Sequence, residues 1–182
     1  YLTQALCISD QGVLFIKDGM NGGMIAIDLN GEIFIPESPA GFEGKPSISA
    51  TSADGKYWVG YAVDKKGGEG LYRPLLWTDG TPEVLPMPEK GFREQELTTG
   101  VMARGISADG SIAYGTIWDN LDFGMVYWDK EGNVHHVGED VRDVREVTMV
   151  DALGEEYQYN LCDGVMTWAG AGNASPSGRW LA

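Results

Sequence analysis

The sequence predicts an all-β protein made of the antiparallel, four-stranded blades of a β-propeller. Three observations predict it: a hairpin recurs along the chain, a second hairpin follows its copies, and glycine and aromatic residues are abundant. The 182 residues include 26 Gly, and Phe, Trp and Tyr together make up 10%. Many glycines between short aromatic and β-branched runs are typical of a chain with many turns. A β-sandwich is the alternative fold for the same pattern.

The first repeated unit is a hairpin around a Ser-Ala-Asp-Gly turn, and its clearest copy runs from Ala103 to Gly115. Apolar residues flank the turn, where Gly accepts positive φ and Asp can bond to the local backbone. We therefore expect positive φ at Gly110. A second copy covers 48–60, a weaker one covers 7–15, and a last one begins over 174–182.

A second type of hairpin follows the first in three places, over 24–35, 74–85 and 125–137. Trp77 and Trp128 stand at the same place before its turn. Two hairpins per roughly 40–50 residues is the period of a four-stranded blade. The units are expected at about 1–45, 46–100 and 101–172, and a further unit starts over 173–182.

The strand that follows each first turn carries apolar or small residues on both faces, which predicts burial on both sides between stacked blades. Gly60 and Gly115 stand at matching places in these strands, where a glycine often marks a close approach of backbone. Four of the six tryptophans lie at repeated strand positions and are expected in the core between blades: Trp58, Trp77, Trp128 and Trp180.

The hairpins amount to three to three-and-a-half blades, with four hairpins of the first type and three of the second. A closed propeller needs at least about four blades. We therefore expect the chain to be a piece of a longer protein. Because an end blade exposes apolar surface, we also expect a homodimer that covers the open blade edge.

The charge balance limits the classes of partner. Lys and Arg number 13 and Asp and Glu number 27, so the formal charge is 13 − 27 = −14. This balance argues against nucleic acid, which binds to a basic face. No apolar run approaches the length of a membrane span, so no membrane insertion is expected. The two cysteines, Cys7 and Cys162, are too few for a disulfide framework, and a bridge between them remains an open alternative to a buried Cys7 thiol.

The sequence predicts no catalytic residue, metal site or cofactor. His135 and His136 are adjacent, so on a strand they point to opposite faces and do not easily share a metal. No Gly-x-Ser-x-Gly motif occurs, and no Ser or Cys can be paired by pattern with His and Asp. Carboxylates are plentiful, yet their spacing does not reveal an acid pair for hydrolysis.

One long excursion, Gly138–Gly172, breaks the repeat and could add a strand pair or an ordered loop. Because repeat proteins vary their loops while keeping their framework, this segment is the expected place of partner specificity. Exposed aromatic rings bind proteins and sugars well. The candidate partner-binding residues are Trp118, Tyr157, Tyr159 and Trp168.

The repeated units resemble known families. The Ser-Ala-Asp-Gly turn, its apolar strand and the later Trp-Thr-Asp-Gly run over 77–80 resemble the HAF-type extracellular repeat. Residues 175–179, Ser-Pro-Ser-Gly-Arg, resemble the Ser-Pro-Asp-Gly-Lys turn of Tol-associated periplasmic propellers and of prolyl-oligopeptidase-type propellers, with Ser177 in place of Asp. The resemblance covers most of the chain outside 138–172. It implies a bacterial, exported propeller, extracellular or periplasmic, that is used for binding, and it carries over no catalytic residue.

Two classes of function follow. The favoured one is a non-enzymatic exported β-propeller module that binds a protein or glycan. The alternative is a hydrolase, or a hydrolase accessory domain, with an acidic site on the loops at the top of the blades. The observation that discriminates them is whether carboxylates, or Trp118 and Trp168, converge on one exposed pocket.

Overall fold

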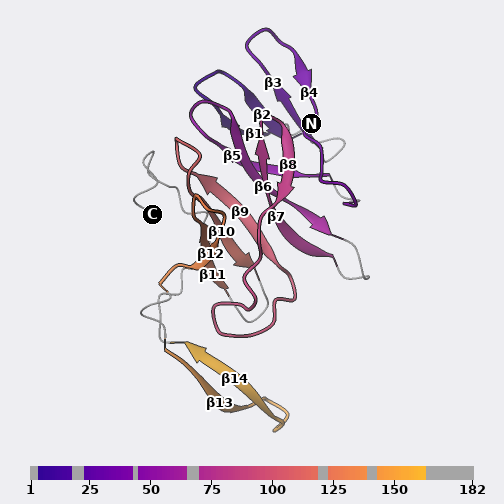
Figure 1. Ribbon diagram of the computed structural model, residues 1–182. Helices are drawn as coiled ribbons and strands as arrows, with labels where there is room; N and C mark the ends of the chain where they lie inside the picture. The colour runs from indigo at the N-terminus through magenta and orange to yellow at the C-terminus, as the bar shows by residue number, and fades with distance from the viewer. Residues whose placement is uncertain are drawn as a thin grey trace.

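The computed structural model describes residues 4–17, 23–42, 45–64, 70–118, 123–138 and 143–162. These residues form three four-stranded antiparallel sheets and one two-stranded hairpin. Figure 1 shows the three sheets stacked next to one another, with the hairpin extending away from them. The described residues include no helix, and so none that is long and apolar enough to cross a membrane. The all-β fold of propeller blades, predicted from the repeated hairpins, is confirmed.

Each of the three sheets is a meander in which every strand pairs with the next one in the chain. The first sheet contains β1 (Gln4–Ile8), β2 (Leu14–Lys17), β3 (Met24–Ile27) and β4 (Ile33–Phe34). The second contains β5 (Ser47–Thr51), β6 (Tyr57–Asp64), β7 (Leu71–Thr78) and β8 (Thr81–Val84). The third contains β9 (Val101–Ile106), β10 (Ala113–Trp118), β11 (Phe123–Trp128) and β12 (Val134–His136). The first strands of neighbouring sheets, β1 with β5 and β5 with β9, lie side by side.

The first turn of each sheet has the conformation that its glycine predicts. The φ angles are 80° at Gly12, 72° at Gly55 and 75° at Gly110. In the third sheet, the buried Ser107 hydroxyl donates to Asp109 Oδ1 at 2.6 Å and accepts from the Ile112 amide at 3.0 Å. The second sheet repeats both bonds in its own turn. A buried serine and the following aspartate therefore hold each Ser-Ala-Asp-Gly turn.

These turns also join one sheet to the next. The Asp10 amide donates to the Ala53 carbonyl at 2.9 Å, and the Ala53 amide donates to the Ala108 carbonyl at 2.9 Å. All three residues stand two positions before the turn glycine of their sheet. The same backbone position is thus hydrogen-bonded from sheet to sheet, so the turns lie in a row at one end of the blades.

The hydrophobic core lies in two layers, one between each pair of neighbouring sheets. Residues Ala113–Ile117 of β10 are all buried, which confirms burial of this strand on both faces. The layer between the first and second sheets includes Phe15, Ile48, Trp58, Leu75 and Trp77. The layer between the second and third sheets includes Val59, Leu85, Val101, Ile117 and Trp128.

Trp77 and Trp128 connect the second and third sheets to the chain segment that follows the last strand of the sheet before. Trp77 and Trp128 are 0% and 1% exposed. The Trp77 indole donates to the Glu37 carbonyl at 2.9 Å, and the Trp128 indole donates to the Pro86 carbonyl at 2.8 Å. Each carbonyl follows the last strand of the sheet before. The prediction of a core role is confirmed for these two and for Trp58, whereas Trp180 lies outside the described residues.

A β-bulge interrupts the first strand of every sheet at the same place. The pairing skips Leu6 in β1, Ser49 in β5 and Arg104 in β9. Each skipped residue stands six positions before the turn glycine of its sheet. At the bulge in β5 the backbones of β5 and β6 lie close together. A Cβ on Gly60 would overlap the carbonyl of Ser47. This contact accounts for the strand glycine and confirms the close approach predicted there.

The hairpin consists of β13 (Val144–Val150) and β14 (Glu156–Cys162), so the excursion contains a strand pair. The Asp151 carboxylate accepts the amides of Leu153 and Glu155 at 2.8 and 2.9 Å, which holds the turn. Most of its described side chains are exposed. The strands therefore owe their order to pairing with each other rather than to a buried core.

Cys7 is a free, partly buried thiol, so the alternative of a bridge to Cys162 is wrong. Burial raises the pKa of the Cys7 thiol to about 12. A thiol with so high a pKa is protonated at neutral pH and is a poor nucleophile. The side chain of Cys162 lies outside the described residues.

Candidate functional site

A groove of about 650 Å³ lies between the second and third sheets, at the end where the turns are. This volume falls within the usual range of ligand pockets, about 300–1,000 Å³. Its floor is largely apolar, and its rim carries charged residues from β8 and from two turns of the third sheet. The apolar lining includes Leu76, Leu85, Ile106, Ala113 and Trp128, and the charged rim is formed by Glu83, Asp109, Asp129, Lys130 and Glu131.

The first turn of the third sheet forms one side of this groove. Asp109 Oδ1 accepts hydrogen bonds from the Ser107 hydroxyl at 2.6 Å, the Ser111 hydroxyl at 2.8 Å and the Ser111 amide at 3.0 Å. These donors, led by Ser107, lower the pKa of Asp109 to about 2. The carboxylate is therefore negative at all ordinary pH values.

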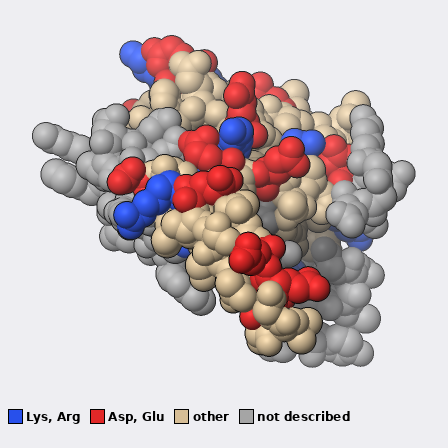
Figure 2. Space-filling view, turned by 90° about the horizontal axis from the view of Figure 1, so that it is seen from below, with Lys and Arg blue, Asp and Glu red and all other residues tan. Residues whose placement is uncertain are grey.

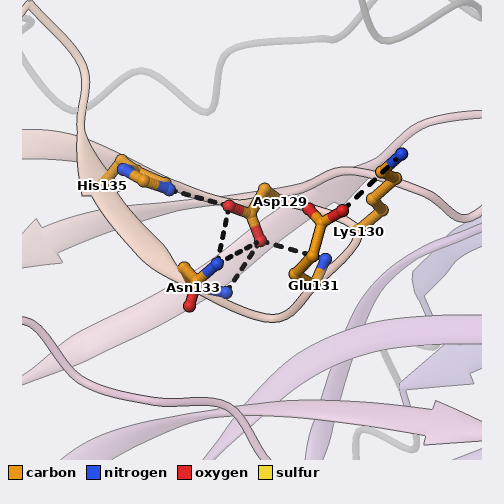
Figure 3. A network of polar contacts seen from close by, with 5 residues as sticks. All are labelled: Asp129, Lys130, Glu131, Asn133 and His135. Atoms are coloured by element: carbon orange, nitrogen blue, oxygen red, sulfur yellow. Dashed lines mark hydrogen bonds and ion pairs between the residues drawn. The ribbon is translucent and has the colours of Figure 1, made fainter.

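A second carboxylate faces the groove from the turn between β11 and β12 (Figure 3). Asp129 Oδ2 lies 2.9 Å from His135 Nε2, and the Asn133 side-chain amide lies 3.0 Å from the same oxygen. Asp129 Oδ1 accepts the backbone amides of Glu131 and Asn133 at 3.0 and 2.8 Å. The hydrogen bond from His135 is the largest cause that lowers the pKa of Asp129 to about 2.

Both aspartates are suited to attracting cations and poorly suited to donating protons. A general acid in glycoside hydrolysis needs a carboxyl group whose pKa is raised. In the part of the chain that the structure describes, every carboxyl group with a displaced pKa has it lowered. The chemistry of the groove is that of an apolar floor beside fixed negative charges.

The surface around the groove is mostly acidic. Among its described lining residues, the groove has the carboxylates of Glu83, Asp109, Asp129 and Glu131 against one basic side chain. Carboxylate side chains also gather in several patches, with few basic ones among them, on the face seen from below in Figure 2. Lys130, the one basic residue in the described lining, lies 3.6 Å from the carboxylate of Glu131 and is exposed. Glu131 carries the opposite charge, so this pair adds no net charge to the rim, which stays negative through Glu83, Asp109 and Asp129. A partner with positive charge is attracted to the groove, and an anionic one is repelled.

We expect the stability of the chain to fall as the pH drops from about 4 to 2, partly because of Asp109. Its pKa is lower in the folded chain than the ordinary value of 3.8, so the ionised form stabilises the fold. This contribution is complete above about pH 4 and is lost as the carboxylate takes up a proton. Urea denaturation between pH 5 and 2 should show a shallower decline for Asp109→Asn than for the unmodified chain. Equal slopes would contradict the role of Asp109.

The two histidines point to different surroundings, as strand alternation predicts. The His135 ring stacks on Tyr127, with the ring centroids 4.8 Å apart and the planes at 20°. The His136 ring contacts Phe92 edge to face, with the centroids 5.9 Å apart. The two imidazoles therefore do not face a common ligand.

Of the four aromatic residues predicted to bind a partner, two are described in full. Tyr157 on β14 is 45% exposed. Tyr159 lies on the same face of β14, and the Arg93 guanidinium lies 5.1 Å from its ring centroid. Trp118 ends β10 with its side chain outside the described residues, and Trp168 lies outside them entirely. The structure thus presents a tyrosine pair on the hairpin.

Sequence reasoning missed the groove because it treated its carboxylates as turn residues. Asp109 and Asp129 belong to different hairpins of one sheet, and each holds its turn as expected. The available signal was their position, because in a meander the turn after the first strand and the turn after the third lie at the same end of the sheet. The groove lies at that end.

Comparisons with known proteins show the fold alone. No family model and no curated protein matches the chain. Among solved structures, it resembles a protein assigned as TolB from Agrobacterium tumefaciens, with a TM-score of 0.57 and 16% identity, covering 99% of this chain and 52% of that one. It also resembles oligogalacturonate lyase from Vibrio parahaemolyticus, with a TM-score of 0.51 and 14% identity, covering 93% and 55%. The chain thus spans about half the length of these two structures.

These matches confirm the β-propeller repeat class that the hairpins predict. The resemblance to Tol-associated propellers is supported at the level of fold, since the first of the two structures carries that name. The more specific likeness to the HAF-type repeat stays a prediction. At such low sequence identity, no site residue is carried over to this chain.

Proposed function

We propose that this chain is a non-enzymatic binding module that holds a cationic, partly apolar segment of a protein partner. The observation that carries this proposal is the groove between the second and third sheets, where an apolar floor adjoins ionised carboxylates. An extracellular or periplasmic location is part of the proposal. It rests on the resemblance of the turns to exported repeats.

The groove matches the chemistry of lysine and arginine side chains. Their aliphatic stems can cover apolar residues such as Leu85 and Trp128, while their charged ends reach the rim. Hydrogen bonds between a cation and a carboxylate are stronger than neutral ones. Asp109 and Asp129 are already oriented by their turns, so little further ordering is needed on binding. A neutral glycan would use the apolar floor but would gain nothing from the charged rim.

The proposal predicts that the rim charges control binding of a basic peptide. The probe is a synthetic peptide of Lys and Leu, compared with the same peptide carrying Glu in place of Lys. We expect only the basic peptide to bind, and the double variant Glu83→Gln, Glu131→Gln to weaken it by about three- to tenfold at low salt. Calorimetry measures both affinities. Both substituted side chains are exposed, and neither holds a turn through its own carboxylate.

The matched control is Glu156→Gln, which removes an exposed charge from the hairpin rather than from the groove. This variant should bind the basic peptide as the unmodified chain does. Equal weakening by Glu156→Gln would show that only the overall charge matters. If a neutral oligosaccharide binds and the basic peptide does not, the partner is a glycan, and the proposal of a cationic protein segment is wrong.

The hydrolase alternative stays a prediction. It places an acidic site on loops at the top of the blades, and Asp109 and Asp129 do lie on turns at one end of the sheets. Their lowered pKa values favour binding over general acid catalysis, because a carboxyl that stays ionised has no proton to donate. This difference makes the binding module the better supported of the two functions.

Two further surfaces belong to the same proposal. Tyr157 and Tyr159, with Trp118 and Trp168, are proposed as partner contacts on and near the hairpin. The exposed tyrosine ring supports this for Tyr157, since such rings are common anchors at interfaces. A homodimer would cover the exposed apolar side chains of the first sheet, which are Leu29, Ile33 and Ile35 at 80%, 64% and 71% exposure.

A further inference from the structure

The three bulge residues converge on a second, smaller pocket. Leu6, Ser49 and Arg104 each leave the pairing of their own strand, and all three line a cavity of about 240 Å³. Bulges commonly redirect a side chain beside a functional site. Lys17 and Tyr61 line the same pocket from the second strands of the first two sheets. This pocket takes residues from the first strands of all three sheets and shares no described lining residue with the acidic groove.

Arg104 is held in the pocket by contacts that leave its charge unopposed. Its Nε donates to Thr116 Oγ1 at 3.4 Å, and its Nη2 lies 3.2 Å from Met102 Sδ. The guanidinium carbon lies 5.3 Å from the centroid of the Tyr61 ring. A hydroxyl, a thioether and an aromatic face orient the guanidinium without neutralising it.

The second cation of the pocket is Lys17, whose side chain is exposed. Among the described residues, no carboxylate forms an ion pair with Lys17 or Arg104. The chain as a whole has 27 acidic and 13 basic residues, so this pocket differs in charge from the acidic groove. Two cations without a carboxylate partner, gathered in one concave place, make a local region that attracts anions.

The pocket also offers neutral donors and apolar walls. Ser47 and Ser49 line it from β5, and their side chains form no hydrogen bond with the described residues. Leu6 and Ile48 supply apolar contact. A ligand there would meet positive charge, hydroxyl donors and hydrocarbon together.

We propose that this pocket binds a small organic carboxylate. The planar guanidinium of Arg104 can hold both oxygens of a carboxylate through parallel hydrogen bonds, and Lys17 adds a second charge. The volume is below that of a typical drug-sized site, so it accommodates one residue with a free carboxylate or one sugar acid. Leu6 and Ile48 contact the carbon part of this ligand.

The test compares matched ligands that differ only in the carboxylate. N-acetylglycine, which represents a peptide C-terminus, is compared with N-acetylglycinamide, and glucuronate is compared with glucose. Two-dimensional NMR follows the backbone amides of the bulge residues and the Nε–H signal of Arg104 during each titration. We expect saturable shifts with at least one of the two carboxylates and none with its neutral counterpart. The carboxylate that binds more tightly identifies the source of the ligand.

Two substitutions locate the binding at Arg104. Arg104→Gln should lower the affinity for the carboxylate ligand by about tenfold or more, because it removes a charged hydrogen-bond donor. Arg73→Gln is the control, since Arg73 lies outside the pocket and 3.8 Å from the Asp64 carboxylate. It should leave the affinity unchanged. The backbone amide spectrum of each variant establishes that the sheets are intact.

The proposal is overturned if neither carboxylate gives saturable shifts, or if Arg104→Gln binds as well as the unmodified chain. It is also overturned if inorganic phosphate saturates the pocket while both carboxylates fail, since the site would then select a different anion. Weakening of equal size in Arg73→Gln would show a general charge effect, and it would overturn the assignment to this pocket as well.

Discussion

Replacement of Trp128 by Ala is expected to lower the free energy of unfolding by about 3–5 kcal/mol. The indole is 1% exposed and belongs to the core layer between the second and third sheets. It also donates to the Pro86 carbonyl at 2.8 Å, which fastens the segment between these sheets. The variant leaves a large cavity and an unpaired backbone carbonyl. Urea denaturation followed by circular dichroism measures the loss.

A Phe at the same position separates the two contributions. Trp128→Phe keeps much of the ring but removes the indole N–H, so we expect it to be clearly milder than Trp128→Ala. The bond to Pro86 alone is worth about 1 kcal/mol. If Trp128→Ala costs less than about 1 kcal/mol, the two sheets do not depend on this side chain for their packing.

Replacement of Gly110 by Val is expected to cost about 3 kcal/mol, from backbone strain together with a steric overlap. The φ angle of 75° lies in the region that β-branched residues rarely adopt, and such strain costs about 1–3 kcal/mol. A Cβ at this position would also overlap the ring of Tyr57, on the neighbouring sheet. The substitution should therefore disturb the turn and the contact between the sheets.

Gly132→Val is the control for strain alone. Its φ is 82°, close to that of Gly110, but a Cβ there would meet no atom within 4 Å. The difference between the two variants in free energy of unfolding isolates the overlap with Tyr57. Equal losses would show that the ring moves aside freely, and an unchanged midpoint for Gly110→Val would show that the turn has a different conformation.

The hairpins and the core were predictable because their causes are local. A turn with positive φ selects glycine, so Gly55 and Gly110 mark their turns in the sequence itself. Trp77 and Trp128 stand at the same position of successive units, and this recurrence placed them in the core. These features depend on a few neighbouring residues and so repeat as recognisable patterns.

The two pockets were not predictable in the same way, because they depend on how strands pair and how sheets stack. A bulge is a property of two strands together, and nothing in β9 alone shows that the pairing skips Arg104. The partner strand carried a partial signal. Gly115 predicted a close approach of two backbones, but it did not reveal that a bulge in β9 causes it. The groove likewise needs the relative placement of Glu83 and Asp129, which belong to different sheets.

The repeated bulge separates residues that build the sheets from residues that can change without altering the sheets. Turn glycines and core tryptophans recur because they build each sheet, and a change in them alters the scaffold. A bulge residue stands outside the pairing, so its side chain can vary while the register of the strands is kept. The chain already shows this variation, with a hydrocarbon at Leu6, a hydroxyl at Ser49 and a cation at Arg104. Substitutions at these three positions are therefore expected to change which ligand the pocket binds while the pairing of the strands is kept, and each sheet can be changed independently of the others.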